Sequence, residues 1–192
     1  MRKQTIKDAY IAVEIEGQDF ASLREGLRTH FGNAGVGCDA ASSGAHISIA
    51  YGEGDVALDA LERVASEIAA LPFSARVESF DFLQGSTTPF DYLVVNLTAD
   101  ECFCAAVEAA QGCMKTKSFS GGFRSHVSLL KFPKGTVSRT WAKEVIKQVI
   151  NEMNICQTLA HALGRQVVLQ GAHVNVFGGD RAHHVSKFFQ AA

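Results

Sequence analysis

Ser125-His126-Val127-Ser128-Leu129-Leu130-Lys131 is the stretch that decides the fold, because an earlier segment, Ala45-His46-Ile47-Ser48-Ile49, has the same pattern. In both segments a histidine and a serine alternate with apolar residues, which is the pattern of a strand with one face in a core. Residues i and i+2 of a strand lie on one face. The sequence therefore predicts two strands that each present an imidazole and a hydroxyl side by side.

The elements around the two motifs repeat in the same order. The first half has the pattern of strand 10–16, a helix from about 19, the His46 strand, helix 58–71 and strand 73–84. The second half has the pattern of strand 90–97, a helix to about 114, the His126 strand, helix 141–164 and closing strand 166–177. His46 follows Tyr10 by 36 residues, and His126 follows Tyr92 by 34. We infer an internal duplication.

This repetition predicts an α+β fold of two pseudo-symmetric β-α-β-α-β lobes, with antiparallel-rich sheets around a central cleft. The chain is expected to form one bilobal domain, with lobe 1 at about 8–86, lobe 2 at about 88–178 and a C-terminal tail at 179–192. Neither unit can bury its sheet face alone, so the lobes should pack together. We expect the two motif histidines to face each other across the cleft, about one phosphate apart.

Composition limits the possible partners. The chain of 192 residues has a net charge of −2 and no dense cluster of Lys and Arg, which disfavours a long nucleic acid held by nonspecific electrostatics. A small nucleotide or short oligonucleotide needs only a few local donors. The N-terminal residues lack the apolar stretch that a secretory signal requires, no run of about 18 apolar residues occurs, and the five cysteines are an odd number. We expect a cytoplasmic, monomeric protein with reduced thiols and no membrane contact.

The paired motifs suit phosphoryl chemistry. One histidine can take a proton from the attacking water or hydroxyl while the other gives one to the leaving oxygen. Ser48 and Ser128 can donate hydrogen bonds to the non-bridging phosphate oxygens. This chemistry requires no metal or other cofactor, and the Cys102-x-Cys104 pair lies in a predicted helix where i and i+2 do not share a face.

A third His-x-Ser, His184-Val185-Ser186, lies near the C-terminus with Lys187 after it in place of an apolar residue. A chain with seven histidines contains about one such triplet by chance. We interpret the third triplet as coincidental and expect it to lie away from the site. The triplets that begin at His46 and His126 recur at matching places in the two halves, which a chance occurrence does not explain.

These residues resemble the 2H phosphoesterase superfamily, which is named for two His-x-Ser/Thr motifs on duplicated lobes. The His126 segment is similar to the second motif of its bacterial RNA-ligase-like branch, commonly Pro-His-hydrophobic-Thr-Leu ending in a basic residue. In this chain Ser125 replaces the proline, and serine replaces threonine at 48 and 128. The resemblance implies a metal-independent phosphoesterase for 2′,3′-cyclic phosphates, 2′–5′ linkages or related nucleotides. It implies both histidines as acid and base, without deciding which is which.

Five further residues are candidates for binding substrate. Phe119 and Phe123 bracket a glycine-bearing loop and either stack on a base or pin the loop by burial. Arg124 is either a phosphate ligand or an exposed ion-pair partner. Lys131 can neutralise phosphate, but alternation from the motif histidine places it on the opposite face unless the strand ends or bulges there. Tyr10, like its counterpart in the second half, either flanks the cleft or is a half-buried strand tyrosine.

The resulting hypothesis is a phosphodiesterase that acts on a cyclic or 2′–5′ linked nucleotide by two-histidine acid/base catalysis. The alternative is a noncatalytic nucleotide- or RNA-binding protein on the same fold, although the histidine strands lack the aromatic run of RNA-binding sheets. A serine esterase is disfavoured because the sequence contains no Gly-x-Ser-x-Gly elbow.

Overall fold

The computed structural model describes residues 6–15, 18–41, 44–56, 58–70, 75–85, 88–99, 101–112, 124–152, 166–167, 169–177 and 183–190. The first half of the chain forms β1 (Ile6–Ile15), α1 (Gln18–Asn33), the short β2 (Asp39–Ala40), β3 (His46–Val56), α2 (Leu58–Ala69) and β4 (Ala75–Leu83). The second half forms β5 (Phe90–Ala99), α3 (Glu101–Gly112), β6 (His126–Pro133), α4 (Arg139–Glu152), β7 (Gln166–Val167), β8 (Leu169–Phe177) and β9 (His183–Gln190). The predicted α+β fold is confirmed, and both halves contain the predicted β-α-β-α-β order.

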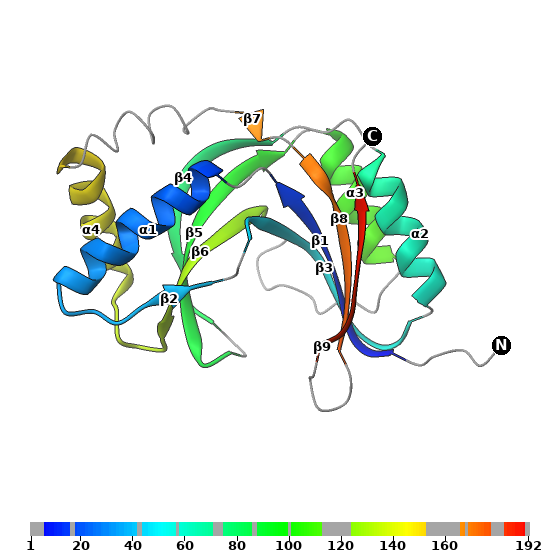
Figure 1. Ribbon diagram of the computed structural model, residues 1–192, viewed down its shortest axis with the longest axis horizontal. Helices are drawn as coiled ribbons and strands as arrows, with labels where there is room; N and C mark the ends of the chain where they lie inside the picture. The colour runs from blue at the N-terminus through cyan, green and yellow to red at the C-terminus, as the bar shows by residue number, and fades with distance from the viewer. Residues whose placement is uncertain are drawn as a thin grey trace.

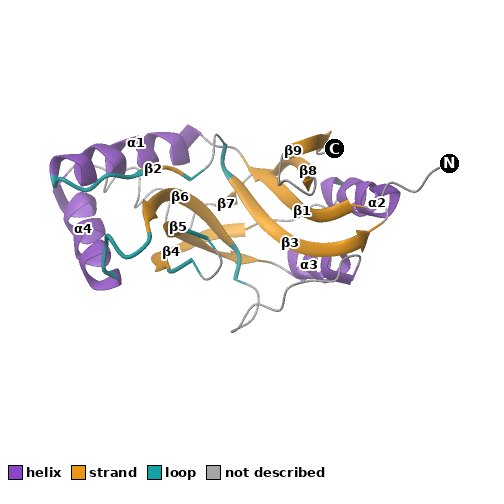
Figure 2. Cartoon of the chain, turned by 90° about the horizontal axis from the view of Figure 1, so that it is seen from below, coloured by secondary structure: helices purple, strands orange, loops and turns teal. Residues whose placement is uncertain are grey.

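The strands pair antiparallel in one sheet with the order β7-β4-β5-β6-β3-β1-β8-β9, and β2 pairs with β6. Figures 1 and 2 show that this sheet bends into an arch, with α1 and α4 on one outer flank and α2 and α3 on the other. The two motif strands, β3 and β6, lie together at its centre. The fold therefore brings the two duplicated motifs into contact along the middle of one sheet.

Helix and strand periodicities account for this layering. Leu61, Val64, Ala65 and Ile68 recur at helical spacing in α2, and all are buried. Over residues 46–49 of β3 and 126–129 of β6, half-buried residues alternate with buried ones, so that one face of each segment lies in the core. The buried faces of both flanks belong to one continuous apolar cluster. Within the described residues, no helix is long and apolar enough to cross a membrane.

The lobe bounds predicted at 8–86 and 88–178 differ from the grouping of elements in space. β4, from the first half, pairs with β5, and β8, from the second half, pairs with β1. The helices follow the same exchange, because α1 contacts β6 and α3 contacts β3. Hydrophobic periodicity defines which face of an element is buried but not which partner covers it, so the exchange could not be predicted from the pattern.

The segment predicted as a C-terminal tail, 179–192, contains β9. This strand pairs with β8 from Gly171↔Gln190 to Phe177↔His183 and forms the edge of the sheet. An edge strand is supported on only one side, and its sequence lacks the clear alternation that identifies half-buried strands. For that reason the pattern alone did not distinguish it from a tail.

Candidate active site

The register between β3 and β6 builds the centre of the candidate site. Ile47 pairs with Val127, and both side chains are buried at 1% exposure or less. In this antiparallel register His46 lies opposite Ser128, and Ser48 lies opposite His126. All four side chains alternate with the buried pair, so they share the face of the sheet that points away from the flanking helices. Two His-x-Ser motifs thus become a two-by-two array on one face.

The dimensions of this array follow from strand geometry. Directly opposite Cβ atoms in an antiparallel pair lie about 4.5–5.5 Å apart, and diagonal ones about 7–8 Å. The two histidines occupy one diagonal and the two serines the other. The expectation that the two histidines lie about one phosphate apart stays a prediction, and the diagonal spacing of the array agrees with it. Half-burial of all four residues leaves each partly accessible.

The ring of His126 is held by the backbone that precedes it. Its Nδ1 lies 2.8 Å from the carbonyl oxygen of Arg124, which can only accept a hydrogen bond. Nδ1 therefore carries the proton, and in the neutral ring Nε2 is the acceptor. Burial of the ring lowers the pKa of His126 from its ordinary value, and the hydrogen bond to Arg124 opposes this lowering. The geometry and the burial both favour a neutral ring that can take up a proton at Nε2.

A histidine-resolved NMR titration should give a midpoint for His126 below about 6.5, the value of an unperturbed histidine. Because the folded pKa is depressed, the stability that His126 contributes is complete above about pH 6.5 and is lost as the pH falls through the folded pKa. The His126→Asn variant should therefore lose less stability than wild type when the pH is lowered. The control variant His30→Asn, changed in the last turn of α1, should lose as much stability as wild type. A midpoint above 6.5 would contradict this description of the ring.

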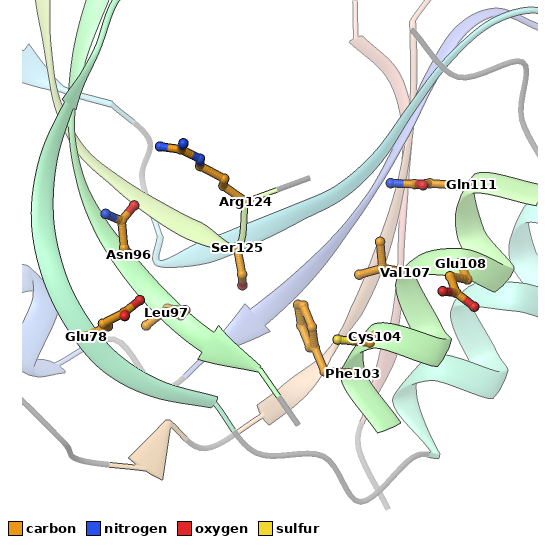
Figure 3. Close-up of a pocket in the computed structure, with 10 residues that line it drawn as sticks. All are labelled: Glu78, Asn96, Leu97, Phe103, Cys104, Val107, Glu108, Gln111, Arg124 and Ser125. Carbon is orange, nitrogen blue, oxygen red and sulfur yellow. The ribbon is translucent and has the colours of Figure 1, made fainter. Parts of the chain in front are cut away.

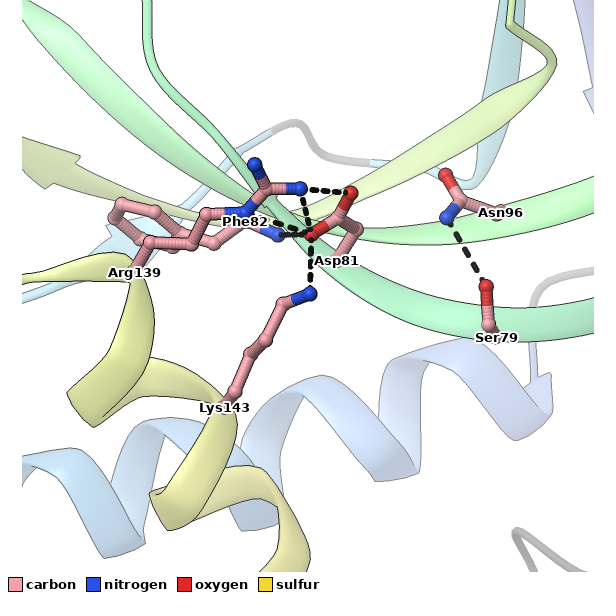
Figure 4. Close-up of polar contacts among 6 residues, drawn as sticks. All are labelled: Ser79, Asp81, Phe82, Asn96, Arg139 and Lys143. Atoms are coloured by element: carbon pink, nitrogen blue, oxygen red, sulfur yellow. Dashed lines mark hydrogen bonds and ion pairs between the residues drawn. The ribbon is translucent and has the colours of Figure 1, made fainter.

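Two polar residues flank the array on the outer strands. Asn96 of β5 pairs with His126, and Glu14 of β1 pairs with His46. The Asn96 side-chain amide donates to the Ser79 hydroxyl at 3.1 Å, which holds it from the next strand (Figure 4). Glu14 and Asn96 each follow the tyrosine of their half by four residues. Sequence reasoning missed both, although this equal spacing in the two halves was the signal that could have found them.

An ion-pair cluster fixes α4 against β4. The Asp81 carboxylate accepts hydrogen bonds from Arg139 Nη2 at 2.7 and 2.8 Å, and Lys143 Nζ lies 3.3 Å from it (Figure 4). Burial alone would raise the pKa of Asp81, but the hydrogen bonds from Arg139, the Phe82 amide and Lys143 together lower it. This contact attaches one flanking helix to the strand that holds Ser79.

A bulge decides the position of Lys131. Val94 pairs with Ser128 but Leu93 pairs with Leu130, so that Leu129 is an extra residue in β6. Leu129 and Leu130 are both buried, and the alternation restarts beyond them with Lys131 half-buried. Lys131 therefore returns to the face of His126, pairs with Tyr92, and places its Nζ 5.1 Å from the centre of the Phe90 ring.

The remaining candidate residues lie on several different elements. Tyr10 is half-buried in β1 and alternates with the buried Ile11, which puts it on the same face as Glu14. Arg124 is exposed directly before β6 (Figure 3). Phe119 and Phe123 lie outside the described residues. The third triplet lies in β9, which is separated from β3 by β1 and β8, a distance of about 14 Å at ordinary strand spacing.

Potential metal ligands do not gather in the described parts of the chain. No group of three or more His, Cys, Asp or Glu side chains is placed to hold an ion in those parts. Cys38 and Cys104 are free thiols, and burial raises the pKa of Cys38.

No family model matches the sequence, and no curated protein matches it. Solved structures with the same fold do exist. Kluyveromyces marxianus Usb1 superposes with a TM-score of 0.55 at 11% identity over 96% of this chain and 98% of that chain. Its complex with uridine monophosphate gives a TM-score of 0.54 at 11% identity, over 96% and 98% of the two chains. E. coli LigT complexed with 3′-AMP gives a TM-score of 0.50 at 12% identity over 98% and 97%.

At these identities the comparisons establish the fold. Usb1 and LigT are members of the 2H phosphoesterase superfamily, and the likeness extends over nearly the whole chain. The resemblance inferred from the two short motifs is therefore confirmed in the architecture that surrounds them. This chain has the fold of the 2H phosphoesterases.

Proposed function

We propose that the protein is a phosphodiesterase that cleaves a cyclic or 2′–5′ linked nucleotide phosphodiester without a metal. The observation that carries the proposal is the pairing of Ile47 with Val127, which places two imidazoles and two hydroxyls on one face. Each histidine then has a hydroxyl two residues along its own strand and another directly across. A phosphate between the histidines meets a proton acceptor, a proton donor and two hydrogen-bond donors.

For a 2′,3′-cyclic phosphate the reaction is hydrolysis to a phosphomonoester. Water attacks phosphorus, His126 Nε2 takes the proton from the water, and His46 gives a proton to the ribose oxygen that leaves. One P–O bond forms and one breaks. Ser48 and Ser128 donate to the non-bridging oxygens, whose negative charge increases in the transition state.

The assignment of roles rests on the surroundings of the two rings. The buried, Nδ1-tethered His126 suits the base. Glu14 pairs with His46 across β1 and β3, so its carboxylate is available to accept a hydrogen bond from the ring that serves as the acid. Lys131, Tyr92 and Phe90 lie further along the same face, where a cation and rings can contact phosphate and base. Tyr10 on β1 is a further candidate contact for the substrate.

A small substrate is favoured over a long polymer. The net charge of −2 provides no extended basic surface. Solved relatives of the same fold hold uridine monophosphate, 3′-AMP and phosphate, which are ligands of the proposed size.

The direct test is a substrate screen of the purified protein with EDTA present. We expect turnover of a 2′,3′-cyclic mononucleotide, a 2′–5′ oligoadenylate or a cyclic dinucleotide, at the same rate with and without the chelator. The His46→Asn, His126→Asn double variant is the control for contaminating hydrolases. Binding of nucleotides without turnover of any of these substrates would instead favour the noncatalytic alternative.

A further inference from the structure

A cavity of about 600 Å³ lies between the ends of β4 and β5, the start of β6 and helix α3 (Figure 3). Leu97, Phe103 and Val107 supply an apolar part of its lining. Polar side chains complete it, among them Glu78, Gln111 and Ser125. Volumes of about 300–1,000 Å³ with apolar walls and a few convergent polar groups are typical of sites for small organic ligands.

The hydroxyl of Ser125 is unsatisfied. The side chain is 8% exposed, and within the described part of the chain its Oγ has no hydrogen-bond partner. Figure 3 shows this oxygen pointing toward Leu97 and Phe103, into the cavity. A buried polar group without a partner costs about 1–3 kcal/mol, so such groups are rare unless a ligand or water completes them. Ser125 also stands where the resembled motif commonly has proline, which has no hydroxyl to offer.

The cavity adjoins the proposed catalytic array. Ser125 immediately precedes His126, and its carbonyl accepts a hydrogen bond from the Leu97 amide at 2.9 Å. Asn96, which pairs with His126 across β5 and β6, also lines the cavity. A nucleotide with its phosphate beside His126 therefore has the cavity within reach of its nucleoside.

The groups that line the cavity fit a particular kind of base. The Gln111 side chain extends from α3 into the space (Figure 3), and a glutamine amide can pair with adenine through one donor and one acceptor. Glu78 contributes an acceptor-only carboxylate, which suits an exocyclic amino group. Uracil has no amino group to satisfy it. The apolar walls can contact the faces of a flat ring.

We propose that this cavity binds an amino-bearing base of the substrate, such as adenine, with Ser125 and Gln111 as its hydrogen-bonding partners. The inference rests on the proposed function, because it takes the ligand to be a nucleotide whose phosphate lies at the histidine pair. It adds a base preference to that function.

The test measures binding of 3′-AMP, 3′-UMP and inorganic phosphate to the whole protein by calorimetry. Wild type should bind 3′-AMP more tightly than 3′-UMP. Ser125→Ala and Gln111→Ala should each weaken 3′-AMP binding by about tenfold, as expected for one lost hydrogen bond, and should leave phosphate binding unchanged. The matched control Ser66→Ala, at an exposed position of α2, should change neither.

Thermal unfolding separates this role from a structural one. Ser125→Ala removes an unpaired buried hydroxyl, so its Tm should equal or exceed that of wild type. Equal affinities for 3′-AMP and 3′-UMP, or unchanged 3′-AMP affinity in both variants, would overturn the proposal even if the protein cleaves phosphodiesters. Base-selective binding that the variants lose, without turnover of any substrate in the screen, would support the base site and refute the phosphodiesterase.

Discussion

Replacing either His46 or His126 by asparagine is expected to lower kcat on a cyclic nucleotide by about 10²–10⁴-fold, the range for loss of one general acid or base. Asparagine is chosen because its amide can still donate to the Arg124 carbonyl that now holds the His126 ring. The backbone around the site should therefore stay in place. Initial rates at saturating substrate, together with Tm values, measure the effect.

The matched control for this loss is His30→Asn. His30 is half-buried in the last turn of α1, a helix that lies on the outer flank of the sheet (Figure 1). It should retain the wild-type rate. If either motif variant kept most of its activity while remaining folded, two-histidine catalysis would be wrong.

The second large effect concerns the two hydroxyls. Ser48→Ala and Ser128→Ala should each lower kcat by about 10²–10³-fold, the cost of removing one donor to an oxyanion. Both serines are half-buried and alternate with core residues, so loss of a hydroxyl leaves the packing of Ile47 and Val127 unchanged. The fold should persist, and the rate should fall without a comparable change in Tm.

Threonine replacement provides the control for the hydroxyl itself. Ser128→Thr keeps an oxygen at the same position, and threonine is the residue that the resembled motif commonly has there. Its rate should remain within about tenfold of wild type, which corresponds to less than about 1.4 kcal/mol in activation free energy. Alanine variants as active as the threonine variant would remove the serines from the mechanism.

The central part of the fold was accessible from the sequence because it depends on local periodicity. Alternation around His46 and His126 gives the strands, and the same order of elements in both halves gives the duplication. The exchange of β4 and β8 between the halves depends on which apolar faces cover each other. That is a property of tertiary packing, which strand and helix patterns do not contain.

The site was accessible only in part, for the same reason. Residues on the motif strands were found from their spacing, but Glu14 and Asn96 join the site through pairing across strands. Lys131 illustrates the limit most clearly. Strict alternation predicts that Lys131 lies on the face of β6 opposite His126. The extra residue Leu129 shifts the alternation by one, so that Lys131 lies on the same face as His126. The consecutive apolar residues Leu129 and Leu130 were the only trace of that bulge in the sequence.

The central claim is that the two histidines act together on one phosphodiester. The most direct measurement is kcat for the His46→Asn, His126→Asn double variant beside the two single variants. Catalytic groups that act as a unit are strongly non-additive, so the double variant should be about as slow as the slower single variant. If the two single losses instead multiplied in the double variant, the histidines would be acting independently, and the account of a shared acid/base pair would be contradicted.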